Sequence, residues 1–307
     1  MEYPDKRIMI PTFPDFKNIE WTDRTEVEQF TKEFPPYSDF NFVSLWSWNT
    51  SENMQLSNLN GNLVALFHDY VTESPFLSYI GTNALSDTAH LLIEYSQCKL
   101  QEPSLKLVPE AVAANLPGTE FTILSDEASH DYILSIAYLS SLDTLPSTHQ
   151  AARYCKKYMQ FYPHHTAHIC PMGDARKDDY ICLFKEWAKI KCLDHLELNE
   201  YGAFERFMEN CDNGNMFVSL YDGSAMIGFA TYEIIAPEYA IVHFTKANHR
   251  YAGVYEQLNF ILSKKLKEHG IRFLNYEQDL GIPALRKSKL KFKPVTYLKK
   301  CIVTKKN

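Results

Sequence analysis

Hydrophobic positions along the 307-residue chain switch repeatedly between the two-residue period of strands and the longer period of helices. Each half of the chain predicts the same order: a hairpin, a third strand, a helix, a strand, a short helix and a last strand. Asn60-Gly61 marks the hairpin turn of the first half, and Asp222-Gly223 marks that of the second. The predicted strands span residues 54–59, 63–70, 76–80, 105–108, 121–124, 132–137, 216–221, 225–235, 239–244, 271–276 and 297–303.

Amphipathic helices are predicted between these strands. The helix over residues 253–268 turns Leu258, Ile261, Leu262 and Leu266 toward a core. The other predicted helices span residues 25–32, 87–99, 110–115, 143–161, 178–195 and 199–211.

Repetition of a whole unit at a spacing of about 150 residues indicates two domains of one architecture rather than a solenoid. We therefore expect an α+β protein with mixed sheets. Its N-terminal domain is expected to span residues 1–145, and its C-terminal domain residues 146–307.

Composition narrows the class of protein. The formal charge of −7 argues against a general nucleic-acid binder. The sequence has no apolar run of about 18 residues and no apolar segment near its start, so neither a transmembrane helix nor a signal peptide is predicted. The seven cysteines lack a C-x-x-C pair, which fits free thiols in a reducing cytoplasm. We therefore expect a cytoplasmic protein.

Charged residues concentrate after the predicted strand at 271–276. Glu277 and Asp279 follow its end, and a short basic helix is predicted to begin at Pro283. Its cations are Arg286, Lys287, Lys289, Lys291 and Lys293. The two carboxylates can hold an incoming amine or act as a general base. The alternatives are that they pair with Arg286 or Lys289, and that the basic helix is a solvated surface helix.

A second candidate segment leads from a strand into the helix at 253–268. Lys246, at the strand's end, can anchor a phosphate or a carbonyl oxygen. Gly253 at the helix start can let an anionic group approach the free backbone N–H groups. Arg250 and Gly253 also resemble part of the pyrophosphate loop of acetyl-CoA-dependent GNAT enzymes. Tyr255, however, would crowd a pyrophosphate lying there. The alternatives are a surface lysine and an ordinary helix start.

The other motifs predict neither a metal site nor a known catalytic loop. His164, His168 and Cys170 are close in sequence, but Pro163 and Pro171 favour a loop or short strand, and no bound metal is predicted. The sequence has no G-x-S-x-G elbow, Walker loop or Rossmann fingerprint.

The stretch YEQDLGIPALRKSKLKFKP, residues 276–294, resembles the closing signature of the DUF2156 family. That family includes the C-terminal catalytic domain of phosphatidylglycerol lysyltransferases. Residues 35–48 and the F-x-K-A phrase around Lys246 are similar to the same family, whereas Ala284 stands where a glycine is common. The resemblance implies two tandem GNAT-like domains with the active site in the C-terminal one.

The resemblance also implies a transferase that moves an activated aminoacyl or acyl group to an amine or hydroxyl. Glu277, Asp279 and Lys246 are then the expected catalytic residues, with Arg286 and Lys289, together with Arg250 and Gly253, binding the donor or substrate.

The expected co-substrate is aminoacyl-tRNA or acyl-CoA, without a permanently bound cofactor, and the acceptor is a small molecule or a lipid headgroup. Full-length phosphatidylglycerol lysyltransferases carry a membrane-embedded half that this sequence lacks, which argues against a lipid acceptor. The alternatives are an acyl-CoA-dependent N-acetyltransferase and a non-catalytic binding module with the same fold.

Overall fold

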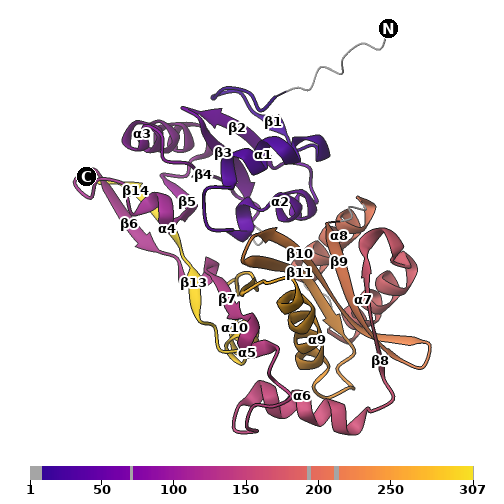
Figure 1. The fold of residues 1–307 in the computed structure, drawn as a ribbon. Coiled ribbons are helices and arrows are strands. Elements are labelled where there is room, and N and C mark those ends of the chain that lie inside the picture. Colours follow the sequence, from indigo (N-terminus) through magenta and orange to yellow (C-terminus); the bar gives the residue numbers. More distant parts are fainter. Residues whose placement is uncertain (1–8, 70–71, 192–194, 211–213, 307) are drawn as a thin grey trace. The chain divides into compact units, whose positions relative to one another are not determined.

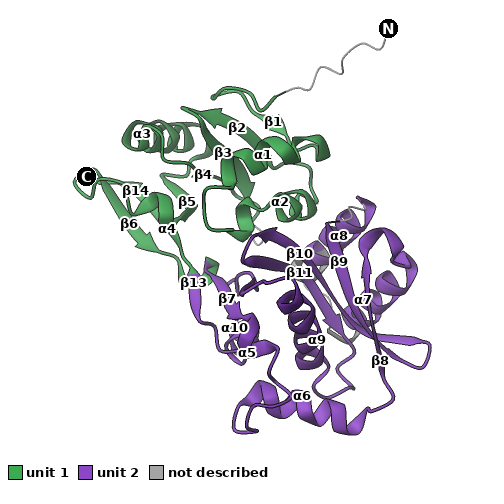
Figure 2. Ribbon diagram, viewed as in Figure 1, with its two compact units in different colours: residues 1–129, 298–307 green, residues 130–297 purple. Residues whose placement is uncertain are grey.

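The computed structural model describes residues 9–69, 72–191, 195–210 and 214–306. The chain forms two compact units, each built on a seven-stranded sheet within these residues (Figures 1 and 2). Unit 1 comprises residues 1–129 and 298–307, and unit 2 comprises residues 130–297. The expected mixed α+β architecture is confirmed, but these bounds differ from the expected 1–145 and 146–307.

Unit 1 begins its sheet with the predicted hairpin. Strands β2 (Gln55–Leu59) and β3 (Asn62–His68) are joined by a tight turn in which Asn60 and Gly61 both have positive φ. Strand β4 (Pro75–Ile80) follows, and α3 (Leu85–Tyr95) connects it to the parallel strand β5 (Ser104–Pro109). The full strand order is β1-β2-β3-β4-β5-β14-β6. Its other elements are β1 (Lys17–Asn18), α1 (Arg24–Thr31), α2 (Phe42–Trp48), α4 (Glu110–Ala113), β6 (Phe121–Ser125) and β14 (Lys300–Lys305).

Unit 2 repeats this plan with longer strands. Strands β9 (Asn215–Asp222) and β10 (Ala225–Ala236) form the predicted hairpin, and β11 (Tyr239–Ala247) continues the antiparallel sheet. Helix α9 (Val254–Glu268) leads to β12 (Phe273–Asn275), which is parallel to β11. The full strand order is β13-β7-β12-β11-β10-β9-β8, with β7 (Asp131–Ser135), β8 (Thr166–Pro171) and β13 (Thr296–Leu298).

Helices cover both faces of the unit 2 sheet. On one face, Leu258, Leu262 and Leu266 of α9 are fully buried in a core that also receives α5 (Ile136–Leu139) and α6 (Gln150–Phe161). On the other face lie α7 (Lys177–Lys191) and α8 (His195–Glu209), which bring aromatic rings against β10 and β11. The last helix, α10 (Pro283–Leu290), follows β12. Among the helices in the described residues, none has the length and apolar character needed to span a membrane.

The bounds of the two units differ from the expected domain bounds because each sheet contains a strand from a distant part of the chain. Strand β7 follows β6 in sequence but pairs with β12 of unit 2. The predicted strand at 297–303 is two strands, and the second, β14, lies between β5 and β6 of unit 1. Hydrophobic periodicity indicates that these segments are strands, but it carries no information about which strand pairs with which.

A buried ion pair fixes the position of β14 in unit 1. The side chain of Lys300 is fully buried; its ammonium group pairs with the Asp39 carboxylate and lies 3.1 Å from the Ser38 hydroxyl. A buried lysine without an anionic partner would be strongly unfavourable, so this pair makes the register of β14 specific.

Replacing Lys300 by methionine should lower the free energy of unfolding of unit 1 by about 3–5 kcal/mol, because the Asp39 carboxylate would remain buried without its partner. The measurement is urea denaturation followed by tryptophan fluorescence, since Trp21, Trp46 and Trp48 all lie in unit 1. Lys299→Met is the control: Lys299 is exposed and 3.2 Å from Glu110, so its loss should cost at most about 1 kcal/mol. Equal losses in the two variants would contradict the assignment.

Candidate active site

The candidate site of unit 2 begins where the chain leaves β12. The buried Asn275 side chain accepts a hydrogen bond from the Glu277 backbone N–H (2.8 Å) and donates one to the Asp131 carboxylate (3.2 Å). The Glu277 carbonyl accepts a hydrogen bond from the Tyr132 N–H at 3.1 Å. These bonds hold Glu277 at a φ of 55°, a left-handed conformation that is uncommon for glutamate and often found at functional sites.

Asp279 lies two residues farther on and is fully buried. Its carboxylate accepts hydrogen bonds from Arg286 Nε (2.7 Å) and Nη2 (3.2 Å), the Tyr132 hydroxyl (2.5 Å) and the Gly281 N–H (2.8 Å). Burial by itself raises the pKa of Asp279, but the bonds from Arg286 and Tyr132 outweigh it and hold the pKa below its usual value. The pairing of Asp279 with Arg286, one of the two alternatives from the sequence, is therefore present in the structure.

Tyr132 connects this ion pair to the rest of the site. Burial, followed by the hydrogen bond to Asp279, raises the pKa of the Tyr132 hydroxyl to about 12. Its ring lies 5.9 Å from the ammonium nitrogen of Lys289, measured to the ring centroid. The sequence does not point to Tyr132, because its strand is predicted to belong to the other domain.

Lys289 projects from α10 toward the end of β12. Its ammonium donates a hydrogen bond to the Tyr276 carbonyl, and it lies 5.3 Å from the centroid of the Tyr276 ring. Burial lowers the pKa of Lys289 to about 8, although the nearby Glu277, Asp131 and Asp279 carboxylates oppose the shift. An amine with this pKa can gain and lose a proton near neutral pH, which an ordinary surface lysine does not do.

Lys246 is a buried residue of β11, not a surface lysine. Its ammonium lies 2.6 Å from a Glu200 carboxylate oxygen, and 3.9 Å and 5.0 Å from the ring centroids of Trp187 and Phe184. The negative charge of Glu200 also favours the protonated form of Lys289 and so raises its pKa. Lys246, Glu277, Asp279, Arg286 and Lys289 therefore gather at one end of the unit 2 sheet.

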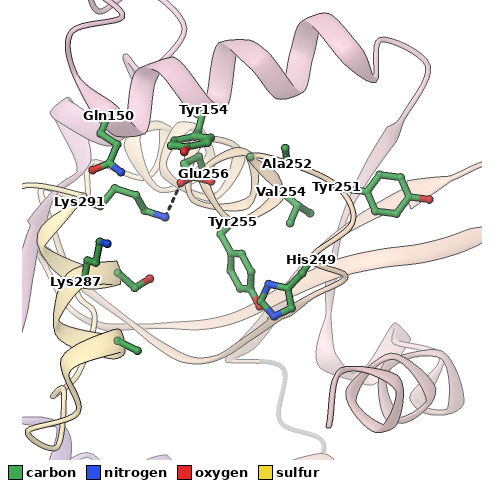
Figure 3. Close-up of a pocket in the computed structure, with 13 residues that line it drawn as sticks. Gln150, Tyr154, His249, Tyr251, Ala252, Val254, Tyr255, Glu256, Lys287 and Lys291 are labelled. Carbon is green, nitrogen blue, oxygen red and sulfur yellow. Dashed lines mark ion pairs between the residues drawn. The ribbon is translucent and has the colours of Figure 1, made fainter. Parts of the chain in front are cut away.

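A pocket of about 340 Å³ is lined by residues of α6, the start of α9 and α10 (Figure 3). Its α10 lining comes from the helix face that carries Ala284, Lys287 and Ser288, whereas Arg286 and Lys289 project from the other face. Lys287 of α10 and Lys291, the residue after that helix, approach the pocket, and the Lys291 ammonium pairs with Glu256 at 2.5 Å. Tyr255 and His249 line another side of the pocket, with ring centroids 5.7 Å apart. The pocket thus combines basic groups with aromatic surface.

Gly253 lines the pocket, and its requirement for glycine has a packing cause. It caps α9 at a φ of 89°, and an added Cβ would lie 2.2 Å from the Tyr154 carbonyl oxygen of α6. Close approach of α6 therefore accounts for the glycine without a bound anion. Arg250, predicted with Gly253, is exposed on the preceding turn, where its N–H donates to the Asn248 side chain at 3.0 Å.

The histidine-rich segment contributes to β8 instead of to the site. The His168 ring packs at 5.1 Å from that of Tyr221, and Cys170 lies 3.9 Å from the Tyr180 hydroxyl. No three potential ligands among the described residues are close enough together to hold a metal ion.

The sequence model of the family described as phosphatidylglycerol lysyltransferase, C-terminal, matches residues 33–304. A conserved protein of unknown function from Bacteroides thetaiotaomicron VPI-5482 has a similar crystal structure, with 25% identity and a TM-score of 0.77 over 97% of this chain and 100% of that one. The structure of L-PGS from Bacillus licheniformis matches with 13% identity and a TM-score of 0.56, over 98% and 95% of the two chains. No curated protein matches the sequence. The family resemblance and the tandem GNAT-like fold predicted from the sequence are confirmed.

Replacing Lys289 by methionine tests its lowered pKa. The pKa of Lys289 is 10.5 in the unfolded chain and about 8 in the folded protein, so the unfolded state binds more protons between these values. Wild-type stability should therefore rise relative to that of Lys289→Met by about 2 kcal/mol from pH 7 to pH 10. Urea denaturation over this range measures the difference. Lys287 is an exposed lysine of the same helix, so the stability difference between the wild type and Lys287→Met should not change with pH. A pH-independent difference for Lys289→Met as well would contradict the assignment.

Gly253→Ala tests whether packing against α6 explains the glycine at this position. The added methyl group meets the Tyr154 carbonyl and a positive φ, so we expect a stability loss well above the roughly 1–2 kcal/mol of the backbone conformation alone. Gly270→Ala is the matched control, because Gly270 also has a positive φ (75°) but faces open space. The two variants are compared by urea denaturation and by hydrogen exchange of peptides from α9. Equal effects would show that α6 does not require the glycine.

Proposed function

Because the chain belongs to the phosphatidylglycerol lysyltransferase C-terminal family, we propose that it transfers an activated aminoacyl group to an amine or hydroxyl acceptor. The observation that carries this proposal is the combination of Glu277 and Lys289 at the end of β12. A carboxylate held in an uncommon backbone conformation lies near an amine whose pKa is lowered to about 8. Together they supply a proton acceptor and a proton donor.

In the proposed reaction, the acceptor nitrogen or oxygen attacks the carbonyl carbon of the donor ester. The new bond to carbon replaces the C–O bond of the ester. Glu277 takes the proton of the acceptor, and the Lys289 ammonium gives a proton to the leaving oxygen. Transfer of a proton from Glu277 to Lys289 through solvent restores both groups. Because the donor ester is already activated, placement of the reactants supplies much of the remaining rate enhancement.

The ion pair of Asp279 and Arg286 has a positioning role in this proposal. Asp279 is surrounded by hydrogen-bond donors, so its carboxylate is poorly suited to remove a proton. The pair instead joins the turn after β12 to α10, which carries Lys289. Lys246 keeps Glu200 and the Trp187 ring in place beside the site.

We propose aminoacyl-tRNA as the donor, in line with the lysyl group in the family description. Two features of the pocket favour it over coenzyme A: α6 covers Gly253, and Tyr255 lines the region where a pyrophosphate would lie. Lys287 of α10 and the aromatic surface of the pocket suit the phosphates and bases of a single-stranded RNA end. Binding of tRNA should then weaken steeply with salt.

The test is transfer of radiolabelled lysine or alanine from charged tRNA to phosphatidylglycerol vesicles or to small primary amines. Glu277→Gln and Lys289→Met should each lower the rate by about 100-fold or more while tRNA binding persists, because each removes one proton-transfer group. Lys299→Met, a surface change in unit 1, serves as the control variant. Transfer from acetyl-CoA alone would favour an N-acetyltransferase. Binding of tRNA without transfer by the wild type would favour a binding module.

A further inference from the structure

A bulge in β11 places His243 at an unusual position in the unit 2 sheet. Thr231 of β10 pairs with Phe244, whereas the next residue, Tyr232, pairs with Val242, so His243 is an extra residue in β11. The His243 and Phe244 rings both pack against Phe207 of α8, with centroids 5.8 Å and 5.3 Å away. Two successive side chains therefore lie on the α8 face of the sheet, which the regular alternation of a strand would prevent.

The bulge brings His243 between two carboxylates. Its Nε2 lies 3.5 Å from a Glu233 carboxylate oxygen, and its Nδ1 lies 3.9 Å from a Glu277 carboxylate oxygen. The exposed fractions of the side chains are 5% for Glu233, 2% for His243 and 19% for Glu277. His243 therefore lies between the buried Glu233 and the candidate base Glu277, which is the most exposed of the three.

Packing alone does not explain this arrangement. Burying a glutamate and a histidine together removes both from water, and apolar residues of similar volume are often at least as stable in such a place. Histidine has a property that an apolar residue or a lysine lacks. Its ring nitrogens can donate a hydrogen to a carboxylate or accept one from a carboxylic acid. His243 can thus interact with Glu277 in either protonation state.

We propose that Glu233 and His243 are positioning residues, which orient the Glu277 carboxylate and set the pH at which it takes up a proton. In this proposal the charge of Glu233, 3.5 Å from Nε2, orients the imidazole, and Nδ1 faces Glu277. The consequence for catalysis rests on the proposed function, but the effect on Glu277 itself does not. Other charged groups of the site are Lys289 of α10, Asp131 of β7 and Asp279 of the turn, and the variants below leave them unchanged.

The experiment measures the protonation of Glu277 without using the reaction. The intact protein is treated with a water-soluble carbodiimide and glycinamide from pH 4.5 to pH 8, and peptide mass spectrometry reports the labelling of Glu277. Because the carbodiimide reacts with the protonated carboxyl group, the midpoint of labelling follows proton uptake. His243→Gln should raise this midpoint by about one pH unit, because the carboxylate loses the ring nitrogen that lies 3.9 Å away. Glu233→Gln should shift it in the same direction by less, because the lost orientation of the imidazole outweighs the removal of a distant like charge.

His165→Gln is the matched control. His165 is also a buried histidine of unit 2, 3.5 Å from an Asp222 carboxylate oxygen, and it should leave the labelling of Glu277 unchanged. Circular dichroism checks that each variant is folded, and Glu233→Gln keeps the test valid if His243→Gln does not fold. An unchanged midpoint in the folded variants would overturn the proposal.

The transfer assay then separates this inference from the proposed function. If both hold, the acid limb of the pH–rate profile moves upward together with the labelling midpoint, and kcat falls while KM for the charged tRNA is retained. A shifted midpoint in a wild type that transfers nothing would support the positioning of Glu277 and reject the transferase. A lower rate with an unchanged midpoint would show a merely structural role and reject the positioning.

Discussion

The end of β12 determines the geometry of the whole candidate site. Strand β12 is short, and it lies between a parallel neighbour, β11, and an antiparallel one, β7. The pairing with β7 continues past the strand through Tyr132, which bonds to both Tyr276 and Glu277. Because these bonds fix the backbone where β12 ends, the turn with Asp279 and the helix with Lys289 have a defined starting point.

Charge burial gives this site its chemical character. A charge inside a protein has lost its favourable hydration, so each buried charge must be balanced by a partner. Arg286 balances Asp279, and Glu200 balances Lys246. Lys289 differs, because carboxylates near it only partly offset its burial and its pKa remains low. The contrast separates groups that hold the structure from a group that can exchange protons.

Much of the architecture follows from local sequence patterns. The hairpin turns at Asn60-Gly61 and Asp222-Gly223 and the long helix α9 are confirmed, because short-range conformational preferences determine them. The domain bounds could not be predicted, since the partners of β7 and β14 depend on long-range pairing. For the candidate site, the sequence predicted a charged cluster at residues 277–289 and, as an alternative, the pairing of Asp279 with Arg286 that the structure contains. It could not identify Tyr132, or the bulge that turns His243 toward Glu277, because both depend on the register between strands.

The location of β14 has a consequence for the order in which the protein folds during synthesis. This strand lies between β5 and β6, so the sheet of unit 1 is complete only after residue 305 has left the ribosome. Every strand of unit 2 is made earlier, and its sheet needs no residue beyond 298. The unit that begins the chain therefore cannot complete its sheet until every strand of unit 2 has been made, and β5 and β6 lack their shared neighbour throughout the synthesis of unit 2.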